Sequence, residues 1–157
     1  MRSDYLNDNS SLSDKVLKIK KITENYTAVK ADSGSYILIN PTAATTLTLP
    51  TITEEYIGWH VKVILGEDAA GADQGMSHVV NIDLGSGTNL ANVGMIQEVD
   101  GAAGDQAVAN DDWIVNTANA NPGNTFDIWC DGYRWYVQGV VGDLTDAAFS
   151  TGATTIA

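Results

Sequence analysis

The sequence predicts an all-β domain, a single antiparallel β-sandwich or jelly-roll-like barrel, and three observations support this. Short runs of β-branched and aromatic residues recur along the chain, separated by clusters of Gly, Asp, Asn, Ser and Pro. Several of these runs alternate apolar and polar residues, as half-buried strands do. No apolar pattern at helical spacing lasts three turns, so substantial helix is not expected.

Length and composition are those of one globular domain. The chain has 157 residues, 44% of them hydrophobic, which is enough to bury a self-sufficient core. The single cysteine, Cys130, excludes an intrachain disulfide framework and a multi-cysteine zinc site. The first 14 residues lack the apolar core of a signal peptide, and no run of about 18 apolar residues occurs. We therefore expect a soluble chain that folds in a reducing compartment.

The charge is distributed unevenly over the three segments that we expect: an N-terminal arm (1–25), a β-domain (26–142) and a C-terminal tail (143–157). The net charge is −12. Residues 1–30 carry six basic side chains against four acidic ones, whereas the rest of the chain carries two against sixteen. A body this acidic repels nucleic acid and anionic membranes, so neither is expected as a partner.

The arm ends in a lysine-rich stretch, "KVLKIKKITENY". Lys15, Lys18, Lys20 and Lys21 are interleaved there with aliphatic residues. One interpretation is an exposed edge strand, because edge strands often carry Lys against unwanted pairing. The other is a basic contact strip for a partner. Both interpretations remain open from the sequence.

The strands of the β-domain are predicted from their alternation. "SYILIN" (35–40) places Ile37 and Ile39 on one face, and "TTLTLP" (45–50) does the same with Leu47 and Leu49. "GWHVKVIL" (58–65) is the clearest strand, and "MSHVVNIDL", "WIVN" and a hairpin over 126–141 follow it. Residues 66–77 and 98–112 are predicted to be long surface loops. The tail is predicted to be at best a weak strand, ordered only against a neighbouring subunit.

The hairpin "FDIWCDGYRWYVQGVV" contains the densest aromatic cluster. A two-residue turn at Asp131-Gly132 would place Trp129 opposite Arg134, so that the guanidinium stacks on the indole. One face would be the core face, formed by Phe126, Ile128, Cys130, Tyr133, Trp135 and Val137. The other face carries Trp129, Arg134 and Tyr136, a mixture enriched at protein interfaces. A subunit interface, local pairing within one sheet and a sugar-binding platform are all compatible with it.

No catalytic set can be assembled from the residues. The only histidines are His60 and His78, and no basic group lies within two residues of Cys130 to activate its thiol. Loop acids could offer oxygen ligands to Ca²⁺, but their spacing matches no EF-hand: Glu67, Asp68, Asp73, Asp100, Asp105, Asp111 and Asp112. We therefore expect no enzyme, no cofactor and no metal.

The order of motifs resembles a known family. "DSGSYILINPTAATTLTLPT", "IGWHVKVIL" and "FDIWCDGYRWYVQGVV", within residues 32–141, are similar to tailed-phage capsid decoration proteins (cement or head-fibre proteins) and to β-domains of tail fibres. The resemblance implies a non-enzymatic homotrimer on the outer capsid surface of a virion, assembled in the host cytoplasm and bound to the major capsid protein. Lys15, Lys18, Lys20 and Lys21 are then candidates for capsid docking, and Trp129, Arg134 and Tyr136 for the subunit interface. A receptor- or glycan-binding tail-fibre domain is the alternative.

Overall fold

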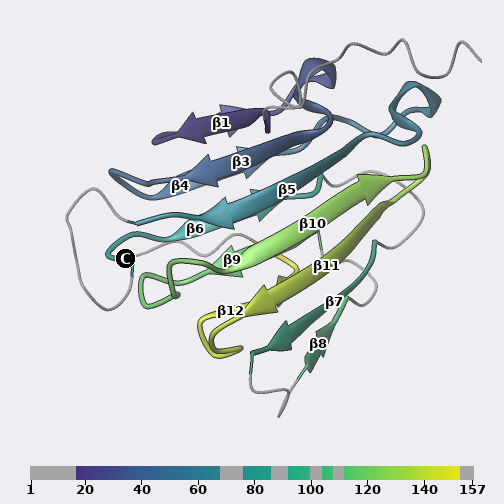
Figure 1. Cartoon of the computed structure of the whole chain (residues 1–157). Coiled ribbons are helices and arrows are strands. Elements are labelled where there is room, and N and C mark those ends of the chain that lie inside the picture. Colours follow the sequence, from purple (N-terminus) through teal and green to yellow (C-terminus); the bar gives the residue numbers. More distant parts are fainter. Residues whose placement is uncertain (1–16, 68–75, 86–91, 100–103, 108–111, 153–157) are drawn as a thin grey trace, which may run out of the picture.

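Two β-sheets lie face to face in the protein (Figure 1). The computed structural model describes residues 17–67, 76–85, 92–99, 104–107 and 112–152. Sheet A has seven strands, in the spatial order β1 (Ile19–Ile22), β3 (Ser35–Ile39), β5 (His60–Leu65), β10 (Thr125–Cys130), β11 (Trp135–Val141), β7 (Val93–Glu98) and β8 (Gly104–Gln106). Sheet B has five, in the order β12 (Ala147–Ser150), β9 (Trp113–Asn116), β6 (Val80–Asp83), β4 (Thr45–Thr48) and β2 (Tyr26–Thr27). The predicted all-β sandwich is confirmed.

Helical structure in the described part of the chain is limited to two single turns of 3₁₀ helix, η3 (Lys30–Asp32) and η4 (Glu54–Tyr56). This agrees with the absence of a helical apolar period in the sequence. Among the same residues, no helix is long and apolar enough to cross a membrane.

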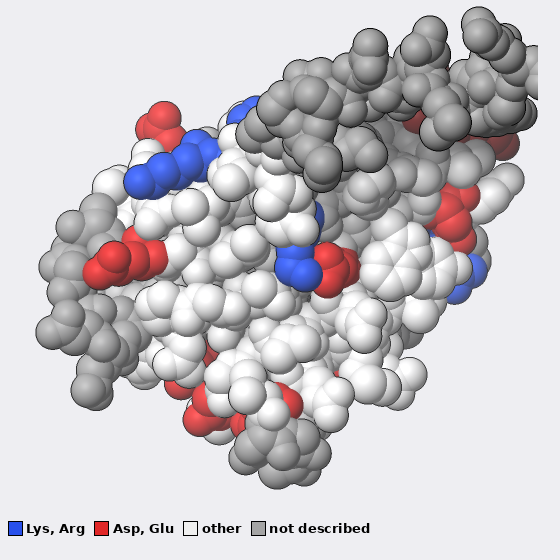
Figure 2. Space-filling view, in the orientation of Figure 1, with Lys and Arg blue, Asp and Glu red and all other residues white. Residues whose placement is uncertain are grey.

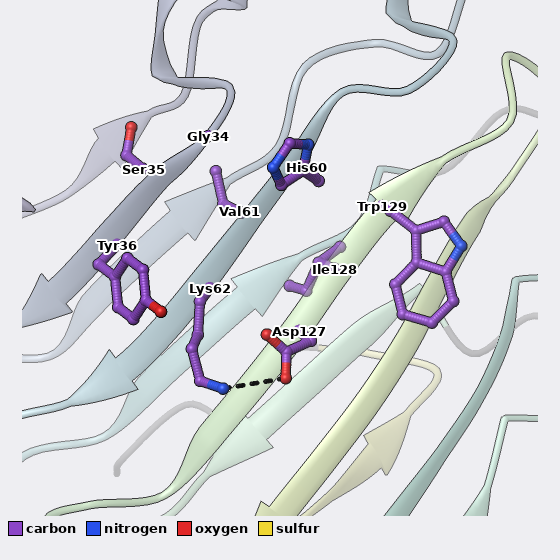
Figure 3. Close-up of a pocket in the computed structure, with 9 residues that line it drawn as sticks. All are labelled: Gly34, Ser35, Tyr36, His60, Val61, Lys62, Asp127, Ile128 and Trp129. Carbon is purple, nitrogen blue, oxygen red and sulfur yellow. Dashed lines mark hydrogen bonds and ion pairs between the residues drawn. The ribbon is translucent and has the colours of Figure 1, made fainter. Parts of the chain in front are cut away.

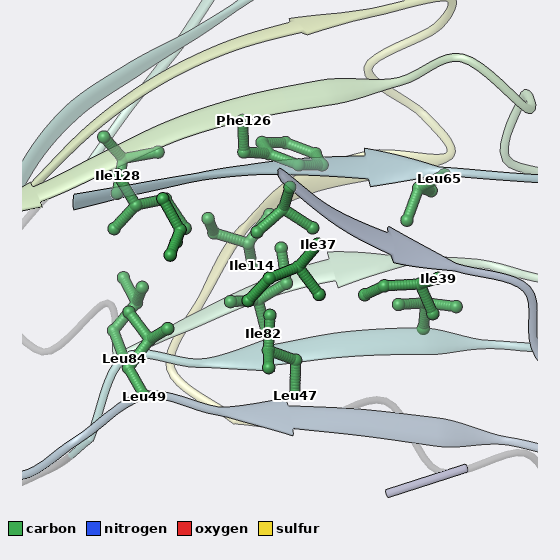
Figure 4. Packing of buried hydrophobic residues seen from close by; sticks show 14 of the residues in the cluster. Ile37, Ile39, Leu47, Leu49, Leu65, Ile82, Leu84, Ile114, Phe126 and Ile128 are labelled. Atoms are coloured by element: carbon green, nitrogen blue, oxygen red, sulfur yellow. The ribbon is translucent and has the colours of Figure 1, made fainter. Parts of the chain in front are cut away.

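The core fills the space between the two sheets, and the period of two in the strands explains it. Ile37, Ile39 and Phe126 of sheet A are fully buried and face Leu47 and Ile82 of sheet B (Figure 4). The alternation predicted for "SYILIN" and "TTLTLP" is confirmed: Ile37 and Ile39 share a buried face, and so do Leu47 and Leu49. Each strand buries one side because successive side chains point to opposite faces of a sheet.

The predicted antiparallel pairing is wrong, since both sheets are mixed. β1, β3 and β5 are parallel neighbours in sheet A, and β2, β4 and β6 are parallel neighbours in sheet B. The chain crosses to the other sheet after each of these strands, so it returns to each sheet running in the same direction. Antiparallel pairs occur where β10 meets β5 and β11, and where β9 meets β6 and β12. Alternation in the sequence reports which side is buried, not which strand is the neighbour.

The sandwich extends beyond the predicted 26–142 at both ends. β1 lies within the segment expected to be an arm and forms the edge of sheet A, as the edge-strand interpretation predicts. β12 lies within the expected tail and pairs with β9, and its Phe149 packs in the core of its own chain. The tail therefore needs no neighbouring subunit to order these residues.

Two further expectations change in the second half of the chain. β7 and β8 were not predicted, and β8 lies inside the stretch 98–112 that was expected to be a loop. The strand expected over "MSHVVNIDL" begins only at Val80, and His78 is half-buried before it. Most of the two predicted loops, with Asp68, Asp73, Asp100 and Asp111, lies outside the described residues.

We predict that the core depends strongly on Phe126. Its ring is fully buried and packs on Gly139 of β11, where a Cβ atom would lie 2.8 Å from Phe126 Cδ1. Phe126→Ala should lower the free energy of unfolding by about 3–5 kcal/mol, because it removes buried apolar area and leaves a cavity. Gln138→Ala, at an exposed position of β11, should change it by less than about 0.5 kcal/mol. Urea unfolding measures both, and equal effects would contradict the assignment of inner and outer faces.

Candidate functional site

The outer face of sheet A is the candidate site. It consists of the side chains that point away from the core on β1, β3, β5, β10, β11 and β7. The registers align them in rows across the sheet, so that Tyr36, Lys62, Asp127 and Gln138 are successive neighbours. A second row runs through Leu38, Ile64, Thr125 and Val140. The site is therefore built by strand pairing between segments far apart in the sequence.

This face is poor in charge and rich in apolar side chains. Seen from the side of sheet A, the molecular surface is mostly uncharged (Figure 2). Among the exposed large hydrophobic residues, five lie at outward positions of these strands: Ile19, Val93, Met95, Trp129 and Val140. A sheet face that meets only water normally carries polar side chains at these positions. The composition of this face is instead that of a contact surface.

A shallow hollow of about 420 Å³ lies on this face between Tyr36 and Trp129 (Figure 3). Its lining comes from three neighbouring strands and the residue before β3: Gly34, Ser35, Tyr36, His60, Val61, Lys62, Asp127, Ile128 and Trp129. Lys62 Nζ and Asp127 Oδ2 form an ion pair at 3.1 Å between β5 and β10. The hollow thus combines two aromatic rings with a charged donor and acceptor.

Two of the three predicted interface residues, Trp129 and Tyr136, are in contact in the structure. Trp129 and Tyr136 are opposite each other in the hairpin, and their rings stack with centroids 5.7 Å apart and planes 10° apart. Arg134 does not face Trp129. It lies in the turn, half-buried, and its Nε has no hydrogen-bond partner within the described residues. The predicted stacking of Arg134 on Trp129 is therefore wrong.

The turn itself explains this difference. It spans four residues, because Cys130 pairs with Trp135 instead of Tyr133. Asp131 Oδ1 accepts hydrogen bonds from the backbone N–H groups of Tyr133 and Arg134, each at 2.8 Å, and Gly132 has a φ of 91°. An aspartate that satisfies the following N–H groups stabilises this wider loop. The register moves by two residues, which preserves the faces but leaves Tyr133 exposed instead of buried.

Asp131 also anchors the aromatic pair. Its Oδ2 accepts a hydrogen bond of 3.0 Å from the Tyr136 hydroxyl. Burial acts to raise the pKa of the Asp131 carboxyl, but the hydrogen bonds that it accepts outweigh this and lower the pKa below its usual range. The same hydrogen bond raises the pKa of Tyr136. The stacked rings are thus held in one orientation by an ionised carboxylate.

The four predicted docking lysines have different environments. Lys15 lies outside the described residues, and Lys18 Nζ donates to the Ala31 carbonyl at the surface. Lys20 is tied into the protein: its Nζ lies 3.0 Å from Asp32 Oδ1, donates to the Tyr26 hydroxyl and lies over the Tyr26 ring. Lys21 is exposed on the outward side of β1. Of the three described lysines, Lys21 is the one best placed to meet a partner.

The other candidate groups that the structure describes have separate environments. His60 is exposed at the rim of the hollow, with Nδ1 3.1 Å from the Gly58 carbonyl. Cys130 is buried, and burial raises the pKa of its thiol. Within the described residues, no three His, Cys, Asp or Glu side chains gather as a metal site would require. Glu67, Asp105 and Asp112 are described, and Asp105 Oδ2 accepts a hydrogen bond from the Phe149 N–H.

Several residues of this face were not predicted from the sequence. Val93, Met95 and Val140 lie on strands or positions that were not singled out. The sequence of β3, "SYILIN", does indicate an apolar outer face, because Ile37 and Leu38 place apolar side chains on both faces of this strand. A strand that is apolar on both sides favours cover on both sides.

Comparison with known proteins adds no relative. A scan of protein-family models finds no match to this chain, and a search of curated proteins finds none either.

We predict that the Lys20, Tyr26 and Asp32 cluster makes stability depend on acid pH. Burial acts to raise the pKa of Asp32, but hydrogen bonds from the Val29 N–H, the Tyr26 hydroxyl and Lys20 outweigh it and lower the pKa below 3.8. A lowered pKa in the folded state stabilises the fold above pH 3.8, and this contribution is lost as the pH falls through the folded-state pKa. Asp32→Asn should therefore be less stable than the wild type at pH 7 and lose less stability between pH 5 and pH 2.

Urea unfolding at pH 7, 5, 3 and 2 measures this difference. If Asp32→Asn showed the same loss of stability on acidification as the wild type, the role given to this carboxylate would be incorrect. Ser33→Ala, beside Asp32 but without an ionisable group, is the control for local disturbance.

Proposed function

We propose that the protein is a non-enzymatic virion structural protein, a capsid decoration protein that binds the outer surface of a phage capsid as a homotrimer and stabilises it. Its partners in this proposal are the major capsid protein and further copies of the same chain. The contact surfaces would be the outer face of sheet A and the lysine-bearing edge at β1.

One observation carries the proposal. The three motifs that resemble decoration proteins are distant in sequence, yet each contributes to one run of adjacent strands in sheet A: β3 from the first, β5 from the second and the β10–β11 hairpin from the third. The first motif also contains β4 of sheet B. These strands are the centre of sheet A, and their outward side chains form much of its uncharged face. The part of the chain that carries the resemblance is thus also the part that presents a surface suited to assembly.

The physical character of the sandwich supports a structural role. Among the described residues, 25 buried ones form one apolar cluster between the two sheets, and Cys130 within it is a free thiol. Each inner strand of both sheets is hydrogen-bonded to a neighbouring strand on both of its edges. Such a domain presents a rigid surface, which suits a protein that must hold its partners in a fixed arrangement.

A saccharide-binding domain of a tail fibre is the second candidate, and the hollow between Tyr36 and Trp129 favours it. Aromatic rings provide flat apolar surfaces, while Lys62, Asp127 and His60 could donate and accept hydrogen bonds. Glycan binding that is lost in Trp129→Ala would support this candidate. The apolar side chains beyond the hollow, such as Val93, Met95 and Val140, are better explained by a protein contact.

Locating the chain on the particle tests the proposal directly. We expect gold-labelled antibodies against this protein to mark the heads of intact virions in electron micrographs, spread over the capsid surface. Label confined to the tail would favour the tail-fibre candidate. Absence of the protein from purified virions would overturn both.

We further predict that Lys21 contributes to capsid binding. Lys21→Glu should weaken binding to capsids assembled without this protein by about tenfold, because it reverses an exposed charge on the edge strand. Lys30→Glu, an equally large change of charge at another exposed lysine, should leave the affinity within about twofold of the wild type. Co-sedimentation with capsids at graded protein concentrations gives both affinities, and equal effects of the two variants would contradict a specific role for Lys21.

A further inference from the structure

Apolar side chains occur on the outer face of sheet A from one edge to the other. From one edge to the other, Ile19 lies on β1, Leu38 on β3, Val140 on β11 and Met95 on β7. Sheet B differs, because β4 and β6 present Thr46, Thr48 and Asp83 at their outward positions. The outward Val115 of β9 in sheet B is already buried within the chain, and none of the described exposed large hydrophobic residues lies on a strand of sheet B. Sheet A is therefore the sheet whose exterior leaves apolar side chains uncovered.

The charge distribution indicates what covers it. The chain carries a net charge of −12, so two copies repel each other through most of their surfaces. Among the described acidic residues, Asp127 alone projects from the outward positions of sheet A, and Lys62 neutralises it at 3.1 Å. Apart from Lys21 on the edge strand β1, the described charged side chains of this face neutralise each other. It is thus the described surface through which two acidic copies can meet without bringing unpaired carboxylates together.

The size of the face is sufficient for such a contact. The six strands of this face, about 4.8 Å apart and four to seven residues long, span roughly 29 Å by 19 Å, or about 550 Å². A stable protein–protein interface buries about 800 Å² of accessible surface on each partner. Because side chains give a sheet face more accessible area than its flat outline, the two areas are comparable.

We infer that the outer face of sheet A is the self-association surface of this protein and that further copies of the chain, the other subunits of the proposed homotrimer, cover it. The inference rests on the proposed structural function and names the surface and the partner of that assembly. Trp129 and Tyr136, locked together by stacking and by the Asp131 carboxylate, are rigid aromatic anchors within it. The Lys62 and Asp127 pair lies between the aliphatic halves of the face.

Substitutions that place a carboxylate on this face test the inference. Met95 and Val140 are 54% and 46% exposed, so Met95→Glu and Val140→Glu should fold normally in a single chain. Each should raise the dissociation constant for self-association at least about 100-fold, since it buries an unpaired charge against an acidic copy. Thr46→Glu, the same new side chain on the outer face of sheet B, should leave self-association unchanged. Light scattering over a range of concentrations, with circular dichroism as a check of folding, measures all four proteins.

Ionic strength provides an independent readout. Raising the salt concentration should strengthen self-association of the wild type, because it screens the repulsion between two bodies of net charge −12 while the apolar contact persists. A contact held by lysines against acids would weaken under the same change.

The results that overturn the inference are distinct from those that overturn the proposed function. A wild-type mass of 16.6 kDa at every concentration, an unchanged mass for Met95→Glu and Val140→Glu, or weaker association at high salt would each exclude this surface. A monomer that binds oligosaccharides through Trp129 would identify the face as a saccharide platform instead. Binding of the wild type to undecorated capsids is measured separately, so its loss would count against the proposed function alone.

Discussion

The pairing of β10 with both β5 and β11 is the constraint on which the rest of the structure depends. The first six strands cross back and forth between the sheets and leave β5 with an open edge in sheet A. An unpaired edge in the middle of a sandwich would leave backbone N–H and C=O groups without partners. β10 closes this edge over five residue pairs, from Trp129 opposite His60 to Thr125 opposite Ile64. It thereby joins the parallel first half of the chain to the second half.

That junction also creates the features of the outer face. Lys62 and Asp127 meet because β5 and β10 are neighbours, and the hollow between Tyr36 and Trp129 spans the same junction. On the inner side, Phe126 lies over Gly139, where any larger residue would collide with its ring. Core packing and surface character are therefore set by one antiparallel strand, whose alternate residues serve the two faces.

The sequence allowed the fold class and the buried faces to be predicted, but not the connections. Ile37 and Ile39 were placed on one face of their strand, as were Leu47 and Leu49, and both pairs are buried, because burial of one side leaves a period of two in each strand. Parallel pairing and the two-residue shift of the hairpin register leave no such trace, since both preserve the alternation. β7 was missed because its sequence, "VGMIQE", shows no regular alternation of apolar and polar residues. Lys20 was expected to meet a partner, and only the fold brings it to Asp32 and Tyr26. The surface role of Trp129 and Tyr136 stays a prediction.

The alternate crossing of β1 to β6 between the two sheets has a consequence for how such a domain can vary. Each pair of strands, one in each sheet, is one coil of a short solenoid, and each coil contacts mainly the coil before it and the coil after it. The first coil, β1 with β2, lies at the free end, whereas the β10–β11 hairpin closes the other end of the solenoid in sheet A. A coil can therefore be gained or lost at the free end without disturbing the hairpin, so the width of the molecule and the chemistry of its central strands can evolve independently.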